Sequence, residues 1–96
     1  MLTENDVQDI SRLIDLLNKV IEYVVEEEGS DLCCKGILKS LRILEGKQRN
    51  GFPNLYNYIM DDFRMMVERG LYGEQRIDTI KNEVCKIIDS NSLFYK

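Results

Sequence analysis

Apolar side chains recur at every third or fourth position in four separate stretches of the chain. This spacing predicts amphipathic helices over residues 4–28, 31–45, 53–69 and 74–89. Glycines fall near the ends of these stretches, and β-strand signals are weak throughout. Four amphipathic helices with short connections favour an all-α fold, an antiparallel four-helix bundle with a long first helix. We expect residues 1–96 to form a single domain.

Each predicted helix has an apolar face that should pack into a common core. In the longest helix this face comprises Val7, Ile10, Leu13, Ile14, Leu17, Val20, Ile21 and Val24, widened by Leu16 and Val25. The next two faces comprise Cys34, Ile37, Leu38, Leu41 and Leu44, and then Leu55, Tyr56, Ile59, Met60, Phe63, Met66 and Val67. The last helix carries a narrow stripe of Ile77, Ile80, Val84, Ile87 and Ile88. A core of this size predicts a net stability of roughly 5–10 kcal/mol.

Local signals mark the expected helix starts. Thr3 is a suitable N-cap for the first helix, with Asp6 three residues later in a near capping box. Ser30 or Asp31 can cap the second helix. Pro53 suits the first position of the third helix, because its missing N–H has no partner there in any case.

Two glycines and the C-terminal tail carry further predictions. Gly46 fits the position just after the second helix. Gly36 lies inside that helix, where glycine costs roughly 1 kcal/mol relative to alanine, and it would permit another helix to approach closely. The tail, residues 91–96, holds the large apolar side chains of Leu93, Phe94 and Tyr95. We expect the tail either to dock on the bundle or to belong to an interface.

Charge is unevenly distributed along a chain with a net charge of −4 and a pI near 4.8. Residues 1–30 hold eight acids and two bases, whereas residues 31–49 hold five bases and two acids. Two explanations remain open: the acids of the first helix pair with bases inside the chain, or they form a face for a basic partner. The overall acidity argues against nucleic-acid binding, which relies on positive charge to neutralise phosphates.

The sequence also predicts a cytoplasmic protein. It contains no run of eighteen apolar residues, so we expect no membrane span. Residues 1–9 carry acids where a secretory signal would carry bases followed by an apolar stretch. Three cysteines, two of them adjacent, do not make a disulfide framework and fit a reducing compartment.

The residue types that most catalysis requires are missing. The chain has no histidine, which removes the usual general base and the commonest metal ligand. Three cysteines fall short of a four-thiolate zinc site, and no glycine-rich phosphate loop is present. Cys33 and Cys34 should diverge on a helix, one buried and one partly exposed, and Cys85 should fill the core. We therefore expect no catalytic, cofactor-binding or metal-binding residues and a protein that is not an enzyme.

Asp61 and Asp62 are adjacent carboxylates in the predicted third helix. Neighbouring helix positions do not face each other, which argues against a shared catalytic or metal-binding role. At helical spacing Asp61 can pair with Arg64, and Arg64 can pair with Glu68. The expected arrangement is a solvated face with salt bridges that is also available to a partner.

The candidate partner-binding residues are therefore acids and tyrosines. The acids at the end of the first helix lie where its dipole disfavours them, which indicates a basic neighbour or fraying in solvent. Tyrosine is favoured in protein interfaces because it combines a large contact area with a polar tip. The predicted partner-binding set is Glu22, Glu26, Glu27, Tyr58, Asp61, Asp62 and Tyr72.

The stretch 61–70 reads Asp-Asp-Phe-Arg-Met-Met-Val-Glu-Arg-Gly, and Ile77, Ile80, Glu83 and Ile87 follow it. This third of the chain resembles the C-terminal half of small all-helical immunity proteins that are encoded beside polymorphic bacterial toxins. In those proteins an acid–aromatic–arginine segment ends one helix and a short helix closes the chain. The resemblance implies a non-catalytic protein that binds a cognate toxin and neutralises it.

A second hypothesis is a structural or regulatory subunit that self-associates, for example as a homodimer, or docks in a larger complex. The narrow apolar stripe of the last predicted helix and the apolar tail 91–96 motivate it.

Overall fold

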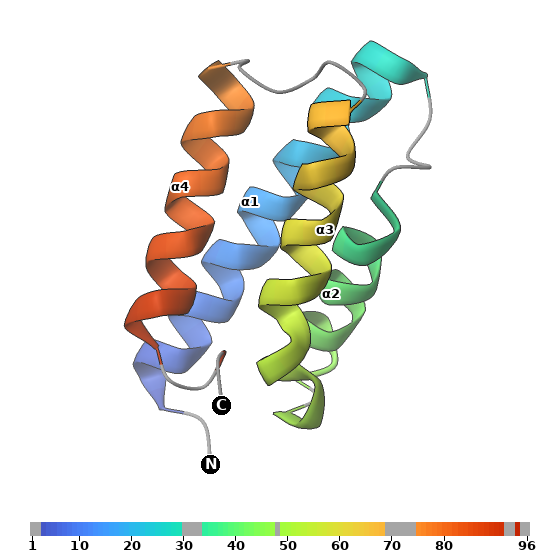
Figure 1. Ribbon diagram of the computed structural model, residues 1–96. Coiled ribbons are helices and arrows are strands. Elements are labelled where there is room, and N and C mark those ends of the chain that lie inside the picture. The colour runs from blue at the N-terminus through green and yellow to red at the C-terminus, as the bar shows by residue number, and fades with distance from the viewer. Residues whose placement is uncertain (1–2, 30–33, 48, 69–74, 92–93, 95–96) are drawn as a thin grey trace.

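The computed structural model describes residues 3–29, 34–47, 49–68, 75–91 and 94, which form a bundle of four α-helices (Figure 1). The helices are α1 (Glu4–Glu28), α2 (Lys35–Glu45), α3 (Leu55–Glu68) and α4 (Gln75–Ser90), with a 3-10 helix, η2 (Arg49–Asn54), before α3. Successive α-helices run in opposite directions, so the predicted all-α bundle with a long first helix is confirmed. No helix within the described ranges is both long and apolar enough to cross a membrane.

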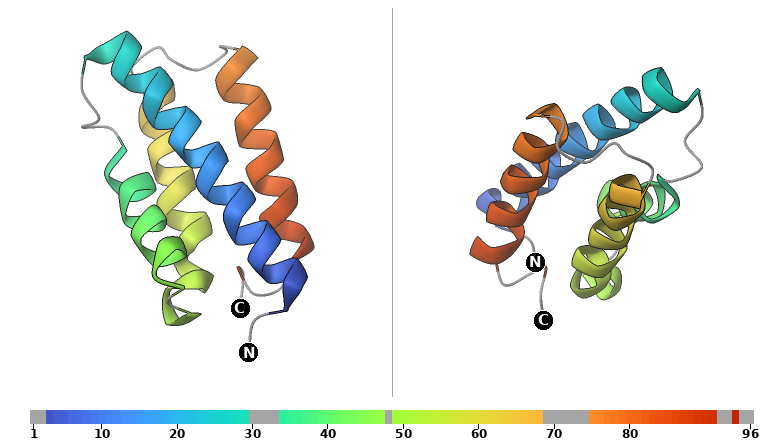
Figure 2. Two further views of the ribbon diagram at one scale, coloured as in Figure 1. Left: turned by 180° about the vertical axis from the view of Figure 1, so that it is seen from behind. Right: turned by 45° about the horizontal axis from the view of Figure 1, so that its top comes forward.

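The four helices are not packed equally tightly. α1 lies across the back of the bundle against α2 and α4, and α2 packs most extensively against α3 (Figure 2). α3 and α4 make the fewest contacts of the neighbouring α-helix pairs, so the bundle is least closed between them. The long dimension of the molecule, 40 Å, corresponds to the 25 residues of α1 at about 1.5 Å per residue.

The core consists mainly of the predicted apolar faces. It includes Ile10, Leu13, Leu17, Val20 and Val24 of α1, Ile37, Leu41 and Leu44 of α2, Ile59, Phe63 and Met66 of α3, and the whole predicted stripe of α4. Two predicted core residues of α1 are not buried, since Val7 and Val25 each keep 43% of their surface exposed. Both project about 100° or more from the centre of the buried face, because successive residues turn by about 100°. The buried stripe of α1 is therefore narrower than predicted.

The start of α1 is capped as predicted and is also tied to the end of α4. The Thr3 hydroxyl accepts a hydrogen bond from the Asp6 N–H at 3.1 Å, and the Asp6 carboxylate accepts one from the Thr3 N–H at 3.0 Å. The side-chain amide of Asn91 donates to Asp6 at 2.9 Å and to Asp9 at 3.0 Å. These bonds hold the two helix ends together at one end of the bundle (Figure 1).

Phe94 shows that the tail docks on the bundle at this position. Its side chain is fully buried, and its ring packs against that of Phe52 in η2, with the centroids 5.6 Å apart. Leu93 and Tyr95 lie outside the described residues. Because Phe94 and the α4 stripe are both buried within the chain, neither provides the self-association surface that the sequence suggested.

Two helix starts differ from the predicted boundaries. α3 begins at Leu55 because Pro53, expected at its first position, lies in η2 instead. α2 is described from Lys35, and its N-cap residue, Cys34, makes no side-chain capping bond. The predicted caps at 30–31 lie outside the described residues.

The ends of α1 and α2 use different residues to turn the chain. Gly29 has a φ of 76° and its N–H donates to the Val25 carbonyl at 2.8 Å, a left-handed turn that glycine adopts without strain. Gly46, predicted to play this part after α2, keeps a φ of −84°, and Lys47 takes the left-handed conformation with a φ of 51°. Gly46 therefore predicted where α2 ends, but the residue with the left-handed conformation is Lys47.

Candidate protein-binding surface

The outer face of α1 carries carboxylates in a line. Asp15, Glu22 and Glu26 are all exposed, and at about 100° per residue they project within about 40° of one another. The line extends over about 16 Å at 1.5 Å per residue. Leu13 and Val20 lie on the opposite, fully buried face of the helix, so these carboxylates face outward on a rigid element. We call Asp15, Glu22 and Glu26 the acidic line.

The two bases of α1 lie to one side of the acidic line. Arg12 turns toward α4, where its guanidinium donates a hydrogen bond to Glu83 at 2.7 Å. This bond and the positive charge hold the pKa of Glu83 below its ordinary value. Lys19 is exposed on the same flank. Arg12 therefore joins α1 to α4, and the three acids of the acidic line with Lys19 beside them keep a net negative charge.

α2 presents a row of positive charge on the neighbouring surface. Lys35, Lys39 and Arg42 are exposed and project within about 60° of one another. The ion pairs within the described residues, Arg12–Glu83 and Arg64–Asp61, do not join this row to α1. The Lys39 ammonium lies instead 4.6 Å from the ring centroid of Tyr58, a cation–π contact with α3. We call Lys35, Lys39 and Arg42 the basic line.

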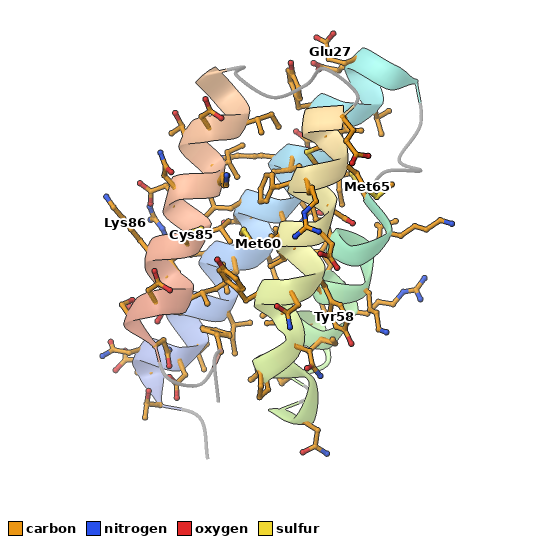
Figure 3. The ribbon with its side chains drawn as sticks, viewed as in Figure 1. Glu27, Tyr58, Met60, Met65, Cys85 and Lys86 are labelled. Carbon is orange, nitrogen blue, oxygen red and sulfur yellow. The ribbon has the colours of Figure 1, made fainter. Side chains whose placement is uncertain are left out.

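The candidates on α3 do not join the acidic line. Asp61 is exposed and pairs at 3.9 Å with Arg64, as predicted, whereas the predicted pair of Arg64 with Glu68 is not among the ion pairs of the described residues. Tyr58 is half-buried on the flank that faces α2, and Figure 3 shows Met65 on the same flank. α1 and α3 make few contacts within the described residues, so their acids belong to separate surfaces.

Asp62 is buried, which corrects the prediction that it lies on a solvated face. Only 4% of its surface is exposed, and one carboxylate oxygen accepts a hydrogen bond from the Ile37 N–H at 2.7 Å. The first N–H groups of a helix have no partner within it, and α2 has no side-chain cap of its own. A carboxylate from α3 therefore caps the N-terminus of α2, where the helix dipole also favours negative charge.

Gly36 allows the two helices to come close enough for this bond. A β-carbon at this position would collide with the Tyr58 carbonyl oxygen and would lie 2.9 Å from an Asp62 carboxylate oxygen. The predicted close helix approach at Gly36 is thus confirmed, with α3 as the partner helix. The hydroxyl of Ser40, also buried, donates to the Gly36 carbonyl at 2.8 Å.

Burial raises the pKa of Asp62 above its ordinary value. The hydrogen bonds from the backbone N–H groups of Ile37 and Gly36 act in the opposite direction, and the nearby Asp61 charge raises the pKa further. The carboxyl is sealed between α2 and α3, so a substrate has no access to it. Its role is to hold two helices together.

A shallow groove lies where α3 and α4 are least tightly packed. It encloses about 450 Å³ and is lined by Tyr56, Asn57, Met60, Asp61, Phe63, Arg64 and Lys81. Figure 3 shows Met60 and Cys85 in the space between the two helices, and Cys85, predicted to fill the core, is only half-buried. Burial raises the pKa of the Cys85 thiol, which disfavours the nucleophilic thiolate. Within the described ranges, no cluster of three potential metal ligands exists.

The structure brings together only part of the predicted partner-binding set. Glu22 and Glu26 share the acidic line with Asp15, which the sequence interpretation missed although it lies seven residues, two helical turns, before Glu22. Glu27 is exposed near the end of α1 (Figure 3), about 100° around the helix from Glu26. Tyr72 lies outside the described residues.

Searches against protein-family models, curated proteins and solved structures find no match for this chain.

Proposed function

We propose that this chain is a non-catalytic protein-binding module that uses the acidic line to bind a basic surface of a partner protein. The observation that carries the proposal is the placement of Asp15, Glu22 and Glu26 in one exposed row along a rigid helix. Fixed carboxylates in a row complement an array of lysines and arginines and accelerate association by electrostatic steering.

Two members of the acidic line, Asp15 and Glu22, cap no helix within the part of the chain that the structure describes. Asp6 caps α1 and Asp62 caps α2, whereas Asp15 and Glu22 are exposed in the middle of a helix. Val25, exposed beside the row, adds apolar area of the kind that the centre of a protein interface requires. The combination of charge with exposed apolar area suits a protein partner better than a small ion.

We propose further that the partner is a bacterial toxin and that binding neutralises it in the cytoplasm. The resemblance of stretch 61–70 to helical immunity proteins supports this proposal. The charge supports it as well, because toxins that act on nucleic acid carry basic surfaces. Binding over such a surface would exclude the anionic substrate, and fast association would limit damage before neutralisation.

The test is capture of a partner by the tagged chain from its native host at about 150 mM salt, where exposed charges are partly screened. Wild type is compared with the double variant Asp15→Lys/Glu22→Lys and with two variants outside the acidic line, Asp61→Lys and Asp89→Lys. Both outside residues are exposed, so all three variants should fold.

We expect the wild type and the Asp89→Lys variant to retain one basic protein that the double variant loses. Loss with Asp61→Lys alone would place the binding surface on α3 and contradict the proposal. The captured protein is then produced in bacteria with and without this chain. Growth arrest that co-production relieves is the expected result, whereas a harmless captured protein would overturn the toxin assignment.

A further inference from the structure

α1 exposes an apolar row next to its acidic line. Val7 and Val25 are exposed, and Ile14 and Ile21 are partly buried at the edge of the core. Spacings of seven, seven and four residues place all four within about 40° of one another on the helix. We call these four residues the apolar row. Such β-branched side chains in water favour a covering partner.

The order of these features across the molecule follows from two fixed contacts. The Arg12–Glu83 bond marks the flank of α1 that faces α4, and the apolar row lies on the other side of the acidic line, toward α2. On α2, Gly36 marks the flank that faces α3, and half-buried Leu38 lies on the opposite side of the basic line, toward α1.

One face, formed by α1 and α2, therefore carries an acidic edge, an apolar middle and a basic edge. The middle comprises the apolar row and Leu38. Figure 2, seen from behind, shows α1 and α2 next to each other on this side. The ion pairs of the described residues, Arg12–Glu83 and Arg64–Asp61, do not join the basic line to α1.

We propose that a second copy of this chain covers this face, with the acidic line of each copy opposite the basic line of the other. A two-fold axis parallel to the helices exchanges the left and right edges of the face, so each acidic edge meets a basic edge and the apolar middles meet. An axis across the helices would place like charges together, which is unfavourable. The charge pattern therefore selects one of the two symmetric arrangements.

This dimer does not rest on the proposed function, because the purified chain alone forms or fails to form it. It also differs from the self-association that the sequence suggested through α4 and the tail, since the α4 stripe and Phe94 are buried within one chain. The dimer uses the acidic line, so a basic partner and a second copy would compete for the same carboxylates.

The experiment is sedimentation velocity on the purified chain at about 50 mM and about 500 mM salt, which changes the range of electrostatic interactions more than threefold. We expect a dimer at low salt that weakens at high salt. The variants Asp15→Lys/Glu22→Lys and Lys35→Glu/Lys39→Glu should each weaken the dimer by at least about tenfold, because each places like charges across the interface.

Mixing the two double variants tests directly whether the acidic line of one copy faces the basic line of the other. In the mixture, α1 of the Asp15→Lys/Glu22→Lys variant is basic and faces α2 of the Lys35→Glu/Lys39→Glu variant, which is acidic. The unaltered basic line of the first variant faces the unaltered acidic line of the second. A heterodimer should therefore form. The double variant Asp61→Lys/Asp89→Lys, at exposed positions of α3 and α4, changes the net charge as much as Asp15→Lys/Glu22→Lys does; it is the charge-matched control and should leave the dimer intact. A wild type that stays monomeric at low salt, or a mixture in which no heterodimer forms, overturns the proposal. Circular dichroism confirms that each variant is folded.

Discussion

The α2–α3 contact and the outer face of α1 use acidic side chains in opposite ways. At the α2–α3 contact a single carboxylate, Asp62, is buried and bonded to backbone N–H groups of the neighbouring helix. On the outer face Asp15 and Glu22 stand in solvent along a helix that is already complete. Asp62 helps to hold the fold together, whereas Asp15 and Glu22 form part of the exposed surface.

The difference teaches that an acid's role depends on which backbone groups it can reach. A buried carboxylate is tolerated only where hydrogen bonds replace its lost hydration, and the uncapped start of α2 supplies them at Asp62. Asp15 and Glu22 are exposed, so water can hydrate their carboxylates. Substitutions at the contact should therefore change stability, whereas substitutions on the outer face should change binding.

The largest effect should come from closing the space at Gly36. The variant Gly36→Ala places a methyl group against the Tyr58 carbonyl and must push α3 away, which we expect to cost about 3 kcal/mol. Gly51→Ala is the comparison variant, because the atoms nearest its methyl group belong to the side chain of Ile43 and not to backbone, and we expect it to cost less than Gly36→Ala. Urea unfolding measures both variants, and equal midpoints would contradict the tight α2–α3 contact.

Removing the interhelical cap should have the next largest effect. Asp62→Ala leaves the Ile37 N–H buried without an acceptor, which we expect to cost about 2 kcal/mol in the free energy of unfolding. Asp62→Asn keeps an oxygen that can accept this bond and should lose less. An alanine variant as stable as wild type would show that Asp62 does not cap α2.

The pH dependence of stability provides a second test of the burial of Asp62. Because burial raises the pKa of Asp62 in the folded state, the folded chain holds this proton more tightly than the unfolded chain does. Asp62 therefore favours folding most at pH values below its ordinary pKa, and this contribution declines as the pH rises through the raised value. The stability of wild type relative to Asp62→Asn should fall over that interval. A relative stability that rises over that interval would contradict the raised pKa.

A smaller effect is expected where α1 meets α4. The Arg12–Glu83 pair is largely exposed, so Arg12→Ala should lower the thermal midpoint by no more than about 4 °C. Added salt should reduce the difference between variant and wild type, because it screens exposed charges. A large, salt-independent loss would place this pair among the contacts that hold the fold together.

The sequence predicted the helices well because apolar spacing directly records which side of each helix is buried. It erred for Val7, Val25 and Tyr56, since their positions fit the helical period but lie at the edge of the buried stripe. It could not separate Asp61 from Asp62, because the difference arises only when α2 docks on α3. Gly36 inside a helix was the available clue to that contact, although it did not identify the partner helix.

The acidic line was partly predictable for a similar reason. Glu22 and Glu26 were selected as acids in the C-terminal part of the first helix, but the residues that share a face are set by helical spacing, which adds Asp15 and separates Glu27. Periodicity applied to the charged residues, as it was to the apolar ones, would have found the line. Only the tertiary contacts show which flank of α1 faces α2.

We propose that the outer acids of α1 bind a basic partner protein and do not stabilise the fold. The most direct test is the near-isosteric variant Asp15→Asn/Glu22→Gln, assayed in one preparation for urea unfolding and for capture of the basic partner. We expect an unfolding midpoint close to that of wild type together with loss of capture. Capture that persists without these charges, or a midpoint that falls as far as that of Asp62→Ala, would contradict it.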